Sequence, residues 1–271
     1  MISDIDLDHV AVAAERQLDA WPRWMVDLGG RWVGGGATAG FHSAQVEWRN
    51  GMRLEVLEPH LVEQNDFLRR FLDRSGPGPH HLTYKVKDLR AALGQVEAAG
   101  HTPVNVSFEN PMWMEAFLYP KASHGIVVQL AQSGFDEPET DWEGGTPRPA
   151  VAPSPRSQPA DLLRVVHLVA DLDGAVALFG GVLAGAPVDE GDDDLGRYIE
   201  LAWPGPGRVR LVAPSSTGAR AWLGDRPGRL HHLRFAVDDA AAVPDAVTLG
   251  DGAWEVPPER NLGTRLILET G

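Results

Sequence analysis

The 271-residue chain contains no cysteine. This absence excludes disulfides, a thiolate nucleophile, cysteine-ligated zinc and cysteine-held iron–sulfur clusters. Any metal ion must therefore bind through histidine, carboxylate or amide oxygen. Basic residues are also scarce, since 24 Lys and Arg stand against 38 Asp and Glu and leave a net charge of −14. An acidic surface repels nucleic acid and anionic lipid, so we expect neither nucleic acid nor a membrane as a main partner.

Long apolar runs are missing as well. No segment approaches the roughly 18 residues needed to span a bilayer. The first ten residues, MISDIDLDHV, lack the basic region and apolar stretch of a signal peptide. We therefore expect a cytoplasmic protein. Neither a G-x-x-x-x-G-K-[ST] loop nor a G-x-S-x-G elbow occurs, which argues against two common phosphate-binding and hydrolase classes.

Proline marks the most visible break in the chain. The segment 133–160 contains prolines at positions 138, 147, 149, 153, 155 and 159, among Gly, Ser and charged residues. Such a composition is typical of an exposed linker. We expect it to separate a first domain, 1–132, from a second domain, 161–271.

An internal repeat runs through both halves. Four segments combine an apolar strand, one histidine and a following helical stretch; their histidines are His9, His81, His167 and His232. The helical stretches are expected at 15–28, 87–99, 172–184 and 238–248. Each unit then follows a βαβββ order. At about 50 to 60 residues one unit is too small to bury a core alone, so two units per domain are expected.

The hairpin around Asn50-Gly51 fixes which side chains share a face. Segments 44–48 and 52–56 both alternate apolar and polar residues. Their apolar sets share a face only if Trp48 lies opposite Met52, which requires a three-residue loop with Gly51 in the left-handed region. The opposite face then carries Gln45, Glu47, Arg53 and Glu55.

The same alternation applies to the other strands of the first domain. It predicts that the first and the last strand of each unit present a polar residue on the polar face of the sheet. These residues are His9, Glu55, His81 and Gln129. The two units present them in equivalent order, with His on the first strand and an oxygen ligand on the last. His9 to Glu55 spans 46 residues and His81 to Gln129 spans 48.

These segments resemble a known family. DHVAV near the N-terminus, LEVLEP at 54–59, PHHLTYKVKDL at 79–89 and FLYPKASHGIVVQL at 117–130 are similar to the vicinal oxygen chelate, or glyoxalase-like, superfamily. The first domain is most similar to members of the methylmalonyl-CoA epimerase type. The resemblance implies an α+β fold of tandem vicinal oxygen chelate domains, each with two βαβββ modules forming a cupped sheet.

The resemblance also implies a metal site. Carried over by position, its ligands are His9, Glu55, His81 and Gln129, and Glu47 is the proton-transfer base. The family usually has Glu where this chain has Gln129. A divalent ion (Zn, Co, Ni, Mn or Fe) would polarise a carbonyl and stabilise an enolate, while Glu47 moves the α-proton.

The implied activity is that of a metal-dependent epimerase, isomerase or lyase. Its substrate would be a small molecule with vicinal oxygens, and a homodimer is possible for such a chain. Arg53 could bind a substrate carboxylate or phosphate, and Trp113 an apolar part of the substrate. Plainer interpretations also exist: Glu47 and Arg53 form a salt bridge across the hairpin, and Trp113 belongs to the core.

In the second domain the equivalent positions are His167, Arg210, His232 and Glu269. A guanidinium has no lone pair for a metal. One interpretation is a degenerate domain. Another is a 2-His-1-carboxylate triad of His167, His232 and Glu269, which resembles the Fe(II) extradiol dioxygenases. A third hypothesis is a non-catalytic protein that binds a drug or metabolite, like bleomycin-resistance members.

Overall fold

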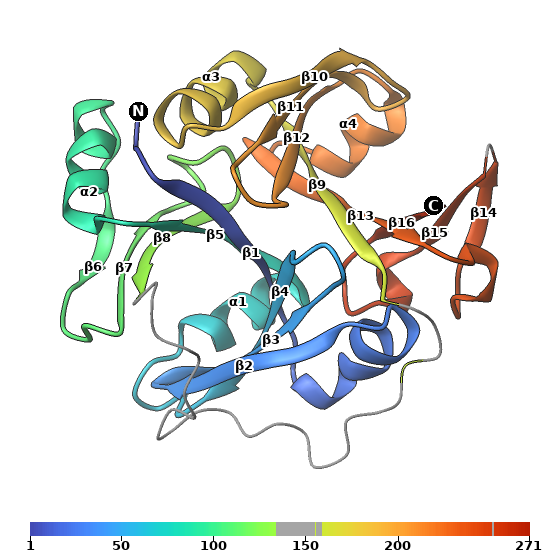
Figure 1. Cartoon of the computed structure of the whole chain (residues 1–271), viewed down its shortest axis with the longest axis horizontal. Helices are drawn as coiled ribbons and strands as arrows, with labels where there is room; N and C mark the ends of the chain where they lie inside the picture. The colour runs from blue at the N-terminus through green and yellow to red at the C-terminus, as the bar shows by residue number, and fades with distance from the viewer. Residues whose placement is uncertain (134–154, 156–158, 251) are drawn as a thin grey trace. The chain divides into compact units, whose positions relative to one another are not determined.

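The computed structural model describes residues 1–133, 155, 159–250 and 252–271. Its strands form two eight-stranded sheets (Figure 1). The first has the order β2-β3-β4-β1-β5-β8-β7-β6, and the second has the order β10-β11-β12-β9-β13-β16-β15-β14. Adding eight to each strand number of the first sheet gives the second. This correspondence confirms the repeat and the tandem α+β fold. Most of the linker expected at 133–160 lies outside the described residues.

The strand bounds follow the chain. The first sheet contains β1 (Ile5–Ala13), β2 (Arg31–Thr38), β3 (Gly40–Glu47), β4 (Arg53–His60), β5 (Gly78–Val86), β6 (Val104–Ser107), β7 (Trp113–Leu118) and β8 (Val127–Ser133). The second sheet contains β9 (Asp161–Val169), β10 (Ala186–Asp192), β11 (Gly196–Ala202), β12 (Arg208–Pro214), β13 (Gly228–Val237), β14 (Val247–Gly250), β15 (Ala253–Val256) and β16 (Leu266–Thr270).

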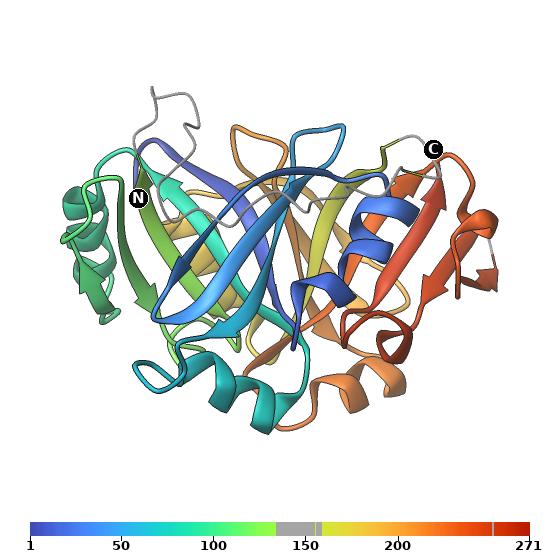
Figure 2. The same ribbon diagram turned by 90° about the horizontal axis from the view of Figure 1, so that it is seen from below.

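Helices are short. The α-helices are α1 (Phe67–Ser75), α2 (Leu89–Ala98), α3 (Leu172–Val176) and α4 (Thr217–Leu223). Short 3-10 or π-helical turns are η1 (Gln17–Asp19), η2 (Pro22–Asp27), η3 (Ala177–Val182), η4 (Ala240–Ala242) and η5 (Pro258–Arg260). Helix α2 packs beside β8, as the green part of Figure 2 shows.

The chain forms two compact units, and each combines modules from both halves of the sequence. One unit contains most of β5, then β6 to β8, together with β10 to β12. The other contains β2 to β4 together with β14 to β16. The divisions fall within β1, β5, β9 and β13, the four strands that carry the repeated histidines. The sheets thus follow the two halves of the sequence whereas the packed units do not, and the domain boundaries at 132 and 161 stay a prediction.

Aromatic side chains explain why modules from different halves pack together. In one unit the ring of Tyr84 on β5 lies 6.5 Å from that of Phe179 and 5.1 Å from that of Trp203. The Trp203 indole donates a hydrogen bond of 2.7 Å to the Leu183 carbonyl. Tyr84 comes from the N-terminal half and its partners from the C-terminal half, so burial of these rings joins the two halves.

The other unit has an equivalent cluster. Trp24 and Trp48 pack on Phe235, with ring centroids 6.4 and 4.9 Å from it and 6.0 Å from each other. Trp48 lies at the hairpin that the sequence predicted. The Gly51 amide donates to the Trp48 carbonyl at 2.9 Å, and Gly51 has φ of 85°. Glu47 pairs with Arg53 across the strands, which confirms the predicted register.

The helix expectations fared unevenly. The stretch 87–99 is confirmed as α2, whereas 15–28 and 172–184 are each divided into two short helical pieces. The expected helix at 238–248 is wrong, because only Ala240–Ala242 is helical and Pro244 follows two residues later. Helices α1 and α4 were not predicted. Phe67, Leu68, Phe71 and Leu72 do recur at helical spacing in α1, and this signal was available.

Candidate metal centre

Two histidines begin the site on neighbouring strands of the first sheet. His9 on β1 is 0% exposed and His81 on β5 is 5% exposed. Their ring centroids lie 5.8 Å apart, with an interplanar angle of 65°. Leu82 and Tyr84, which alternate with His81, are buried in the apolar core. The opposite face of β5 therefore presents His81, as strand alternation predicted.

Glu55 on β4 completes a cluster of three possible ligands. One ligand atom each of His9, Glu55 and His81 lies within 4.8 Å of the others, and all three residues are buried. Ligand atoms around one ion stand about 3 to 4 Å apart, because each bond is roughly 2.0–2.2 Å long. Small side-chain rotations would close the remaining gap. Two imidazoles and one carboxylate thus fit a divalent transition metal.

Asp8 orients the first histidine. Its carboxylate lies 2.6 Å from His9 Nδ1 and 3.2 Å from the ammonium of Lys85. An ionised carboxylate only accepts hydrogen bonds, so Nδ1 carries the proton and the ring lone pair is on Nε2. This carboxylate–histidine arrangement is common behind metal ligands, where it fixes the tautomer and ring orientation. Sequence reasoning missed Asp8 because alternation places adjacent residues on opposite faces.

Gln129 on β8 is held at both ends of its amide. The Thr83 hydroxyl donates to Gln129 Oε1 at 2.6 Å, and Gln129 Nε2 donates to Glu115 Oε2 at 2.7 Å. The Trp113 indole donates to the same Glu115 oxygen at 2.9 Å. Gln129 is 6% exposed. Its role as a fourth ligand and the substrate contact of Trp113 stay predictions, and Glu115 joins the candidate residues.

Glu47 lies on the same strand face as Gln45, which is opposite Glu55 in the hairpin. The Gln45 amide donates to Glu55 at 3.3 Å. Both oxygens of Glu47 accept hydrogen bonds from guanidinium groups, Arg31 at 2.6 Å and Arg53 at 2.9 Å. The structure therefore shows the salt bridge that the sequence offered as an alternative, and the catalytic role of Glu47 stays a prediction.

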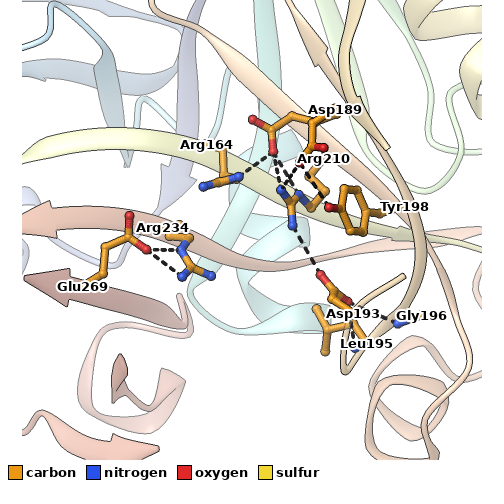
Figure 3. Close-up of polar contacts among 10 residues, drawn as sticks. Arg164, Asp189, Asp193, Leu195, Gly196, Tyr198, Arg210, Arg234 and Glu269 are labelled. Atoms are coloured by element: carbon orange, nitrogen blue, oxygen red, sulfur yellow. Dashed lines mark hydrogen bonds and ion pairs between the residues drawn. The ribbon is translucent and has the colours of Figure 1, made fainter. Parts of the chain in front are cut away.

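In the second sheet, three arginines pair with carboxylates, namely Arg164, Arg210 and Arg234 (Figure 3). Arg210 on β12 donates to Glu200 at 2.9 Å, and Arg164 donates to the same Glu200 oxygen at 2.5 Å. Arg210 also pairs with Asp189 at 3.1 Å and stacks 3.8 Å above the ring of Tyr198. The acidic side chains around Arg210 need no metal ion to neutralise them, because they are already paired with this guanidinium.

The residues of the alternative iron triad have other partners. Glu269 pairs with Arg234 at 2.6 Å (Figure 3). His167 Nε2 lies 2.7 Å from the backbone carbonyl of His124, and burial lowers the pKa of His167 to about 4. In the part of the chain that the structure describes, the spacing expected of metal ligands occurs at His9, Glu55 and His81 and not at His167, His232 and Glu269.

Two equivalent eight-stranded sheets and a buried His–Glu–His cluster that could hold a metal ion characterise this chain. Residues 8–114 match the family model described as Glyoxalase/Bleomycin resistance protein/Dioxygenase superfamily. These 107 residues are therefore similar to this superfamily. No curated protein matches the sequence. Among the described residues, no helix is long and apolar enough to cross a membrane.

One solved structure shows the same fold over nearly the whole chain. A mutant of 4-hydroxymandelate synthase from Streptomyces coelicolor is 13% identical, with a TM-score of 0.68 over 98% of this chain and 93% of that one. Methylmalonyl-CoA epimerase from Mycobacterium tuberculosis is 23% identical, with a TM-score of 0.44 over 49% of this chain and 93% of that one. A Streptomyces coelicolor methylmalonyl-CoA epimerase variant in complex with 2-nitronate-propionyl-CoA is 20% identical, with a TM-score of 0.42 over 47% of this chain and 96% of that one.

Proposed function

We propose that this chain is a metal-dependent enzyme that moves a proton α to a carbonyl group, as an epimerase, isomerase or lyase. The observation that carries the proposal is the buried cluster of His9, Glu55 and His81. Gln129 would supply a fourth, neutral oxygen ligand. The metal is Zn, Co, Ni, Mn or Fe, and the substrate is a small molecule with neighbouring oxygens. We also propose a cytoplasmic homodimer.

When bound, the ion supplies Lewis-acid polarisation of the carbonyl. The chain itself supplies the base. Glu47 accepts and returns the proton, and its two arginines hold it in place before the substrate arrives. An anionic group on the substrate would attract Arg53 and weaken its pairing with Glu47. Substrate binding would then release the base where it is needed.

Metal analysis of the purified chain tests the metal site. We expect about one ion per chain, lost in His9→Ala and kept in His167→Ala. Loss of iron in His167→Ala alone would favour a dioxygenase of the second sheet instead. A protein without metal in either form would favour a non-catalytic binding protein. The His167→Ala variant also serves as the control for removal of a buried imidazole.

Hydrogen exchange tests the chemistry. Methylmalonyl-CoA is a reasonable first probe, because it is the substrate named for several structural neighbours. In deuterated buffer we expect uptake of deuterium at the α-carbon. Glu47→Gln should slow it by about 10² to 10⁴-fold, as loss of a general base does. Glu109→Gln, an exposed residue with the same charge change, is the matched control. Equal exchange in both variants would exclude Glu47 as the base.

A further inference from the structure

The second module of the first sheet places a carboxylate beside Gln129 rather than at position 129. Glu115 lies on β7, opposite Ala131 on β8, two residues along the strand from Gln129. Residues two apart on a strand share a face. Gln129 and Glu115 therefore lie on one side of the sheet, and their side chains meet at 2.7 Å.

The hydrogen bonds fix which end of the Gln129 amide points where. An ionised Glu115 only accepts, so it must receive the NH₂ end. The oxygen end is then directed to Thr83 on β5, the strand that also carries His81. A carbonyl oxygen has two lone pairs, and the Thr83 hydroxyl occupies one of them. The second lone pair is what a metal ligand requires.

We propose that Glu115 is a positioning residue of the metal centre, which holds the Gln129 amide with its oxygen toward the strand of His81. This inference rests on the proposed metal-dependent function. The same contact gives a reason for glutamine at this position. A carboxylate at position 129 would face the carboxylate of Glu115 across 2.7 Å, and two like charges at that distance repel. In this module the carboxylate is therefore Glu115 on β7, and the neutral Gln129 on β8 is the proposed ligand.

Three variants of the full chain test the inference by titration with Co²⁺ alone, followed by calorimetry and visible absorption. Glu115→Gln removes the partner that selects the amide orientation. We expect Co²⁺ to bind about 10 to 100-fold more weakly, as when other supporting partners of metal ligands are removed. Gln129→Glu alone should also weaken binding. The double variant Glu115→Gln/Gln129→Glu exchanges donor and acceptor and should restore the parent affinity to within about threefold.

Glu109→Gln is the matched control, because it is exposed and changes the net charge equally. Its Co²⁺ affinity should equal that of the parent. Thermal unfolding of each metal-free variant shows whether it is folded at the titration temperature. If Glu115→Gln does not fold, the comparison of Gln129→Glu with the double variant still decides.

The outcomes separate the two proposals. If the parent does not bind Co²⁺, the proposed function fails and this inference fails with it. If the parent binds and Glu115→Gln binds within twofold of it, only the role of Glu115 is refuted. Tighter binding by Gln129→Glu than by the double variant would also refute it, since the extra anion would then act simply as a better ligand.

Discussion

Acid should destabilise this protein through His167. This residue is 0% exposed, and its Nε2 atom lies 2.7 Å from the His124 carbonyl. A carbonyl only accepts, so Nε2 carries a proton and the neutral form has its lone pair on Nδ1. Nδ1 is buried and has no hydrogen-bond partner among the residues that the structure describes. Protonation would therefore place a charge in the core, away from water, and this burial lowers the pKa of His167 to about 4 despite the hydrogen bond to His124.

The pH dependence follows from this difference between the folded and the unfolded chain. An unfolded histidine has a pKa of about 6.5. Between pH 6.5 and pH 4 the unfolded state binds more protons, so the free energy of unfolding falls as the pH falls. With these two pKa values, lowering the pH from 7.5 to 5 costs about 2 kcal/mol from this one side chain. The stability is fully present above pH 6.5.

Urea unfolding at pH 7.5 and pH 5 measures this cost. His167→Gln keeps an amide N–H for the His124 carbonyl but cannot take up the proton. We expect the free energy of unfolding of the variant to fall by about 2 kcal/mol less than that of the parent. His101→Gln is the control and should behave as the parent does. Equal losses in the parent and in His167→Gln would show that the buried imidazole does not oppose protonation.

Three further predictions concern other parts of the structure. Asp8→Asn should weaken Co²⁺ binding about 10 to 100-fold, because His9 loses an ionised acceptor, and calorimetry would measure it. Gly228→Ala should lower the melting temperature strongly, since a Cβ there would lie 1.8 Å from a backbone carbonyl oxygen. Gly218→Ala, in the first turn of α4, meets no atom within 4 Å and should raise stability by about 0.4–1 kcal/mol. Phe235→Ala should cost about 3 to 5 kcal/mol in chemical unfolding, because it removes a ring that packs against two tryptophans.

Local rules predicted the elements that local sequence controls. The hairpin at Gly51 has the predicted loop, and strand alternation correctly placed Glu47 and Glu55 on one face and Leu82 in the core. These results follow from a period of two and from one glycine in the left-handed region, both of which are visible in a short window of sequence. The repeat predicted that the two halves would have equivalent strands, and the two sheets do have equivalent strand orders.

Contacts between residues far apart in the chain could not be predicted from the sequence. No local pattern shows that Tyr84 packs on Phe179 and Trp203, because the rings come from different halves of the chain. Glu115 escaped for a similar reason. Its role depends on a partner 14 residues away on the next strand, and a single glutamate on a strand is usually a solvated side chain.

The two sheets show how one repeat can give two outcomes. His9 and His167 occupy equivalent places, and both are 0% exposed. His9 has a carboxylate at Nδ1, which favours a lone pair on Nε2, whereas His167 uses its Nε2 proton for a backbone carbonyl. At the position of Glu55 the second sheet has Arg210, whose permanent cation is paired with Glu200. A guanidinium can neutralise a carboxylate as an ion can, so Glu200 in the second sheet needs no ion. Removal of the proposed ion should therefore loosen the first sheet and leave the second intact.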